Sequence, residues 1–156
     1  MKKKGFPVLA LVCSIAFFFM APLDAHAVLG GSVDSVNKDV ANMKAARQAV
    51  KSGPGYTVYD ITSSTLSLRE YVSPDGVVFG IVWNGIFNPD LSNLLGSYYG
   101  QYRQARRQMP VVRGKRSMRV QTDDVVVEKW GHMRSMHGRA YVPALLPAGV
   151  GADVIR

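Results

Sequence analysis

The chain has 156 residues, with 19 lysines and arginines against 11 aspartates and glutamates, so its formal charge at neutral pH is +8. This length suits one ordinary domain and is short for two. Its one cysteine, Cys13, excludes an internal disulfide and any metal site built from several thiolates. The positive charge favours an anionic partner.

The first 27 residues have the pattern of a cleavable secretory signal peptide. Three lysines precede an apolar run from Val8 to Met20, and Ala25-His26-Ala27 has the small residues of a cleavage site. The run is shorter than the roughly 20 apolar residues that cross a bilayer. We therefore expect cleavage between Ala27 and Val28 and export to the periplasm or the medium. The mature chain, which loses three lysines and one aspartate, has a formal charge of +6.

The mature chain begins with a predicted amphipathic helix from about Ser32 to Val50. Its apolar residues recur at helical spacing: Val33, Val36, Val40, Met43 and Val50. Ser32 is a good N-cap, and Ser52-Gly53-Pro54-Gly55 is expected to end the helix.

Three runs rich in β-branched and aromatic residues follow: Tyr56 to Thr62, Leu66 to Ser73 and Val77 to Trp83. Ser73-Pro74-Asp75-Gly76 predicts a tight turn between the second and third runs. Both sets of alternate positions in the third run lack polar side chains: Val77, Phe79, Ile81 and Trp83 on one face and Val78, Gly80 and Val82 on the other. A strand without a polar face is expected at the centre of a sheet.

The second half of the chain repeats this order. Asn88 and Pro89 predict the start of a second helix, with an apolar stripe from Leu91 to Tyr102 that extends towards Arg107. Three further strands are predicted, at Ser117 to Gln121, Val125 to Met133 and Gly138 to Val142. Their connections are Thr122 to Asp124 and Arg134 to His137, and Ala144 to Arg156 is expected to be an extended tail.

The sequence thus predicts a single α+β domain with the order α-β-β-β-α-β-β-β. We expect an antiparallel sheet of about six strands with both amphipathic helices on one face. Arg69-Glu70-Tyr71-Val72 is echoed by Arg139-Ala140-Tyr141-Val142, but the two segments do not fall on equivalent strands of the two units. The echo therefore leaves an internal duplication open.

Several stretches of the mature chain are long enough to be specific. They are Leu29-Gly30-Gly31-Ser32, Arg69-Glu70-Tyr71-Val72-Ser73-Pro74-Asp75-Gly76-Val77, Pro89-Asp90-Leu91, Leu94-Leu95-Gly96-Ser97-Tyr98, Gly131-His132-Met133 and Gly138-Arg139-Ala140-Tyr141-Val142-Pro143. In these stretches the chain resembles domain-of-unknown-function family 2844, a group of short exported proteobacterial proteins. The resemblance implies export and one continuous fold, and it brings no activity, cofactor or catalytic residue.

A basic stretch is the main candidate for a binding surface. Its cations are Arg103, Arg106, Arg107, Arg113, Lys115, Arg116 and Arg119, and no carboxylate lies among them. Tyrosines at positions 98, 99 and 102 precede it, as on nucleic-acid surfaces, but export argues against nucleic acid as the partner. Lipopolysaccharide, anionic phospholipid or an acidic envelope protein would satisfy the same charges. A simply solvated charge run remains the alternative.

A second candidate is a copper site at His132, Met133, Met136 and His137, because imidazoles and thioethers suit copper. The histidines are five positions apart and face oppositely on a continuous strand. Only a turn at Arg134 to His137 would bring them together, and Arg134 would place positive charge beside the metal. The simpler interpretation is a hairpin in which Met133 packs and His137 lies at the rim.

We therefore expect a non-enzymatic envelope protein that contacts the membrane only peripherally once the signal is removed, and that binds an anionic component or a partner protein. The alternatives are the copper-binding protein above and an uncharacterised enzyme. No hydrolase elbow or phosphate-binding loop occurs in the sequence, and no cofactor is predicted.

The signal-peptide prediction can be tested directly. N-terminal sequencing of the protein from an envelope fraction should begin at Val28 or within a residue or two of it. Recovery of an intact Met1 from the membrane fraction would contradict this prediction.

Overall fold

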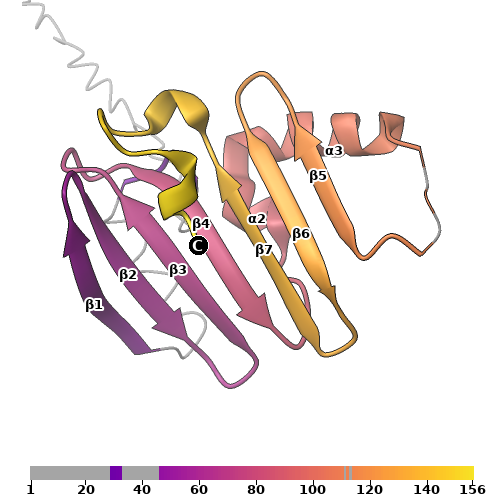
Figure 1. Ribbon diagram of the computed structural model, residues 1–156, viewed down its shortest axis with the longest axis horizontal. Helices are drawn as coiled ribbons and strands as arrows, with labels where there is room; N and C mark the ends of the chain where they lie inside the picture. Colours follow the sequence, from indigo (N-terminus) through magenta and orange to yellow (C-terminus); the bar gives the residue numbers. More distant parts are fainter. Residues whose placement is uncertain (1–28, 33–45, 111, 113) are drawn as a thin grey trace, which may run out of the picture.

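The strand-forming runs of the sequence assemble into a seven-stranded antiparallel sheet with the order β1-β2-β3-β4-β7-β6-β5 (Figure 1). This computed structural model describes residues 29–32, 46–110, 112 and 114–156. The strands are β1 (Ala46–Gly53), β2 (Tyr56–Thr62), β3 (Leu66–Val72), β4 (Val78–Gly85), β5 (Ser117–Gln121), β6 (Val126–His132) and β7 (Ser135–Tyr141). The predicted α+β class and antiparallel sheet are confirmed.

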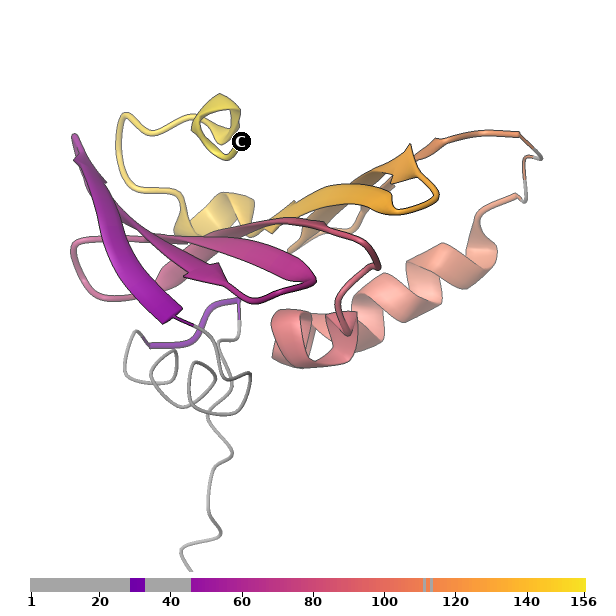
Figure 2. The same ribbon diagram turned by 90° about the horizontal axis from the view of Figure 1, so that it is seen from below.

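The two faces of the sheet are covered by different segments (Figure 2). One face carries a helical segment made of α2 (Leu91–Leu95), the 3₁₀ turn η1 (Gly96–Tyr98) and α3 (Tyr99–Gln108). The other face carries residues 143–156, which we call the C-terminal strap and which contain the short 3₁₀ turns η2 (Pro143–Leu145) and η3 (Ala152–Val154).

Strand β4 is the central strand, as its apolar sequence predicts. On the helix side, Ile81 and Trp83 pack in a cluster with Leu95 of α2 and Val127 of β6. The Trp83 ring lies over Gly138 of β7, where any side chain would collide with it. On the strap side, a second cluster joins strand residues to the strap: Val58, Tyr71, Phe79, Val126, Tyr141, Val150 and Ile155.

The predicted division of β4 into two faces is wrong at its first two residues. The pairing of β3 with β4 shifts register, so that Tyr71 lies opposite Gly80 while Val72 lies opposite Val78. Phe79 is the extra residue of this bulge, and a bulge interrupts the alternation of side chains. Val78 therefore joins the helix-side cluster and Phe79 the strap-side cluster.

The predicted first helix is wrong in its last part, because residues 46–53 form strand β1, which pairs with β2. The glycines and proline at positions 53–55 do not end a helix but turn the chain back as a hairpin, with Gly55 at a φ of +82°. Backbone pairing with β2 outweighs the helical spacing of the apolar residues. Residues 33–45, which would form the rest of that helix, lie outside the described residues, as do the predicted signal peptide and its cleavage site at Ala27 and Val28.

Two further boundaries differ from the prediction. The helical segment begins after Asp90, whose carboxylate accepts a hydrogen bond from the Ser92 backbone N–H at 2.9 Å, so Asp90 takes the N-cap role expected of Asn88. Strand β7 begins at Ser135 because a two-residue turn at Met133 and Arg134, the latter with a φ of +65°, completes the hairpin. The predicted connection Arg134 to His137 was therefore too long.

The expected extended tail is instead a packed strap. Val150 and Ile155 are buried in it, and the Ile155 side chain fills the space left by Gly80, where a Cβ would lie 2.9 Å from Ile155 Cδ1. Arg69 and Arg139 both donate hydrogen bonds to backbone carbonyls of the strap. The strap is thus part of the core and not an appendage.

The two echoed sequence segments meet at this point of the fold. Strands β3 and β7 flank β4, and Tyr71 and Tyr141 both lie opposite Gly80. Arg69 and Arg139 likewise both lie opposite Val82. The similar segments therefore occupy matching places on the two sides of the central strand.

Docking of the strap can be tested by truncating its deepest side chain. We expect Ile155→Ala to lower the free energy of unfolding by about 2 kcal/mol or more, because it leaves a cavity above Gly80. The matched change Val154→Ala, in the same turn but only partly buried, should cost less. Urea unfolding of the two variants measures the difference, and equal losses would contradict the packing described here.

Candidate functional site: a cationic groove

Four cationic side chains line one groove of about 410 Å³ beside strands β5 and β6, which we call the cationic groove. Its lining residues are Asn88, Arg106, Lys115, Arg116, Ser117, Met118, Lys129, Trp130, Gly131 and Met136. A smaller cavity of about 170 Å³ adjoins it and shares Arg106, Lys115, Ser117 and Met118. None of these described lining residues is an aspartate or a glutamate.

The four cations of the groove come from three separate parts of the chain. Helix α3 contributes Arg106, the loop before β5 contributes Lys115 and Arg116, and β6 contributes Lys129. The Gly131 N–H donates to the Arg116 carbonyl at 3.2 Å, which ties the loop to the β6–β7 hairpin. Lys129 lies opposite Met118 in the sheet, and its Nζ is 5.9 Å from the centre of the Tyr102 ring.

The positive charges in the groove repel one another. Burial lowers the pKa of Lys129 below its ordinary value of 10.5, and the positive charge of Arg106 lowers this pKa further. Burial raises the pKa of Tyr102, with a smaller opposing effect of Arg106, so the phenol stays neutral and provides no counter-charge. A partly buried ammonium beside a guanidinium is stabilised by an anion that enters the groove.

The structure divides the seven predicted cations. Arg106, Lys115 and Arg116 line the cationic groove, whereas Arg103 and Arg107 are exposed on α3 outside its lining. Arg113 lies outside the described residues. The basic stretch is therefore only partly a single surface.

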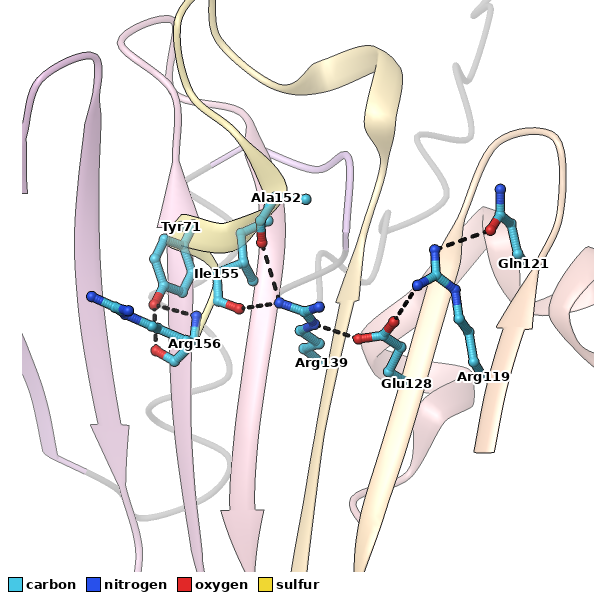
Figure 3. Close-up of polar contacts among 8 residues, drawn as sticks. All are labelled: Tyr71, Arg119, Gln121, Glu128, Arg139, Ala152, Ile155 and Arg156. Atoms are coloured by element: carbon cyan, nitrogen blue, oxygen red, sulfur yellow. Dashed lines mark hydrogen bonds and ion pairs between the residues drawn. The ribbon is translucent and has the colours of Figure 1, made fainter. Parts of the chain in front are cut away.

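Arg119 belongs to a different network on the strap side of the sheet (Figure 3). Its Nη1 donates to Glu128 at 2.8 Å and its Nη2 to Gln121 at 3.1 Å. The other oxygen of Glu128 accepts from Arg139 Nε. Arg139 in turn donates to the carbonyls of Ala152 at 3.2 Å and Ile155 at 2.9 Å. The charge of Arg119 is thus compensated inside the protein.

Another cavity, of about 310 Å³, lies beside the end of the strap. Two of its polar side chains, Tyr71 and Arg69, have partners within the chain. The Tyr71 hydroxyl donates to the Arg156 carbonyl at 2.7 Å and accepts from the Arg156 N–H at 3.1 Å. Arg69 is bonded to Asp60 at 2.9 Å, which raises the pKa of Arg69. This cavity anchors the strap and offers less unmet charge than the cationic groove.

The residues of the copper hypothesis lie on the β6–β7 hairpin, where both histidines contact neighbouring residues of the same hairpin. The His137 ring stacks on Trp130 with 6.1 Å between centroids, and its Nε2 is 3.1 Å from Ser135 Oγ. The His132 Nδ1 lies 3.1 Å from the Met133 carbonyl oxygen. Met133 was expected to pack but is 85% exposed, because the tight turn directs it away from the sheet.

Among the described residues, no three His, Cys, Asp or Glu side chains lie close enough to hold a metal ion. Copper binding stays an untested prediction.

Lys129 is the cation of the groove that the sequence analysis missed. It lies 13 positions after Arg116 and on another strand, so only the register of β5 and β6 brings the two cations to one groove. A signal was present: Lys129 alternates with Val127, which faces the helix-side core, and a lysine at such a position is unusual.

The fold and the groove define a class of small α+β proteins: one antiparallel sheet, covered by a helical segment on one face and a strap on the other, with a cationic groove beside the helix. Within that class, the chain belongs to the DUF2844 family of proteins of unknown function, whose sequence model matches residues 25–155. No curated protein and no solved structure gave a significant match. Within the described part of the chain, no helix has the length and apolar character to cross a membrane.

The lowered pKa of Lys129 predicts a pH dependence of stability. Because the pKa is lower in the folded than in the unfolded chain, the unfolded chain holds more protons between the two values, and stability rises with pH in that window. At pH values below the pKa of Lys129 in the folded chain, the buried positive charge lowers the stability of the protein by its full amount. The stability of Lys129→Met relative to the parent should therefore be highest near neutral pH and decline as the pH approaches 10.5.

Urea unfolding at a series of pH values measures this difference. Lys115→Met provides the matched control, because Lys115 is an exposed lysine of the same groove. Its stability relative to the parent should stay constant over the same range. A constant difference for Lys129→Met as well would show that burial of this ammonium is not costly.

Proposed function

We propose that the mature protein is an exported, non-enzymatic cell-envelope protein that binds an anionic envelope component in the cationic groove. The observation that supports this most is the convergence of Arg106, Lys115, Arg116 and Lys129 on a lining without a carboxylate among its described residues. Self-repulsion of this kind has a cost in the free protein, and a bound anion removes it. A purely structural role gives no reason for such an arrangement.

Phosphate-bearing molecules fit the groove chemically. Guanidinium groups bind phosphate oxygens in a bidentate manner, and lysines add point charges. The volume of about 410 Å³ is that of an ordinary ligand site and admits a phosphate group with part of the molecule that bears it. Ser117 is the one hydroxyl of the lining, and no His, Asp or Glu of the described lining is placed to activate it, which favours binding over catalysis.

The envelope location rests on the sequence. A signal-peptide pattern covers residues 1–27, and the region matched by the family begins at residue 25, next to the predicted cleavage site. An exported basic protein meets phosphate-bearing lipids and polymers at the surfaces of the envelope. These two facts support the proposed compartment.

A charge-matched pair of variants tests the groove. Lys115→Gln with Arg116→Gln removes two cations from the lining, and Arg103→Gln with Arg107→Gln removes two exposed cations outside it. Titration calorimetry with inorganic polyphosphate should show at least about tenfold weaker binding for the groove variant, a loss of about 1.4 kcal/mol. The outer variant should bind nearly as the parent does.

Salt and stability provide the controls for this experiment. Binding by the parent should weaken steeply with salt, because the screening length falls from about 10 Å at 0.1 M to about 3 Å at 1 M. Thermal unfolding of both variants should change little, since exposed charges contribute little to folding. Equal losses in the two variants would indicate a response to net charge alone and would refute a specific groove.

A further inference from the structure

Four large apolar side chains are exposed at one end of the sheet, and we call them the apolar tip. They are Phe87 at 71%, Met133 at 85%, Trp130 at 42% and Ile86 at 37% exposed. Phe87 and Ile86 follow the end of β4, and Trp130 and Met133 belong to the β6–β7 hairpin. Exposed aromatic and thioether groups that gather in one place indicate an interaction surface.

Strand register shows that these residues share one end of the sheet. Gly85, the last residue of β4, lies opposite Met136, and Met136 lies opposite Gly131. Phe87 is two residues beyond Gly85 and Met133 is two beyond Gly131, so both extend past the same row of the sheet. In Figure 1 the arrowhead of β4 and the β6–β7 hairpin accordingly lie at the same, lower end.

The cationic groove reaches the same end. Asn88, Trp130, Gly131 and Met136 line it, and they are the neighbours or members of the apolar tip. Arg134, in the hairpin turn beside Met133, is a further exposed cation. Asp90, the nearest acidic residue along the chain from Phe87, is bonded to Ser92 at the start of α2.

We propose that the apolar tip inserts into the interfacial layer of an anionic phospholipid bilayer while the cationic groove binds lipid phosphates. This inference rests on the proposed function and names its partner. Neither element is sufficient alone, since stable attachment to a membrane surface combines a small apolar insertion with a basic patch. An acidic protein would match the cations but would leave Phe87 and Met133 without a role.

Tryptophan fluorescence provides a direct readout. The chain has two tryptophans, of which Trp83 is 1% exposed and Trp130 is 42% exposed. A change on binding therefore reports Trp130. Vesicles of phosphatidylcholine with phosphatidylglycerol should shift its emission to shorter wavelength, and lipids with brominated acyl chains should quench it. Vesicles of phosphatidylcholine alone should bind much more weakly.

A second set of variants separates insertion from charge. Phe87→Ser with Met133→Ser should weaken partitioning into the mixed vesicles by about tenfold or more, because two apolar side chains no longer leave water. Val112→Ser is the control, since Val112 is 60% exposed but lies in the loop between α3 and β5. It should partition as the parent does. Both variants should bind inorganic polyphosphate like the parent.

The outcomes distinguish this inference from the proposed function. Binding of polyphosphate without binding to mixed vesicles would refute the membrane inference and retain the groove. Vesicle binding without quenching by brominated lipids, or equal losses in the tip and Val112 variants, would also refute insertion. Absence of binding to both polyphosphate and vesicles at low salt would refute both proposals.

Discussion

The structure depends on one constraint: the central strand β4 has no polar face. A sheet built around such a strand must be covered on both sides, or apolar residues such as Phe79 and Ile81 would remain in water. The helical segment 91–108 covers one side, and the strap covers the other. Gly80 allows the strap to approach β4 closely, because Ile155 packs where a side chain at position 80 would lie.

The two covering segments determine which partners the arginines on each side of the sheet have. Arg69 and Arg139, on the strands that flank β4, bind carbonyl groups of the strap, and Glu128 balances Arg139 together with Arg119. On the strap side, Arg69, Arg119 and Arg139 thus donate hydrogen bonds to carboxylate, side-chain amide or backbone oxygens. On the helix side, the groove gathers cations without a carboxylate in its described lining. Arg69, Arg119 and Arg139 are therefore compensated within the protein, and the cations of the groove on the helix side are not compensated by a carboxylate of its described lining. We take this difference as the mark of the candidate site.

The groove and the apolar tip lie at one end of the sheet because β6 and β7 form a tight hairpin beside the end of β4. A two-residue turn leaves Met133 85% exposed, and the same hairpin holds the loop that carries Arg116. The hairpin thus places part of the cationic groove beside exposed apolar side chains. This combination is the basis of the proposed binding to an anionic bilayer, where phosphates meet acyl chains.

The sequence alone determines the local structure of this protein: the bounds of β2 and β5, the turn at Ser73–Gly76, the central place of β4 and the apolar face of the helical segment. These features depend on spacing and turn chemistry within a few residues. Only the tertiary structure decides that residues 46–53 form a strand, that the strap packs on the sheet, that Arg119 pairs with Glu128 and that Lys129 joins the groove. Each of these outcomes is set by pairing or packing with another element, which local propensity does not contain. The element is the adjacent strand for residues 46–53 and Arg119, and it lies farther along the chain for the strap and Lys129.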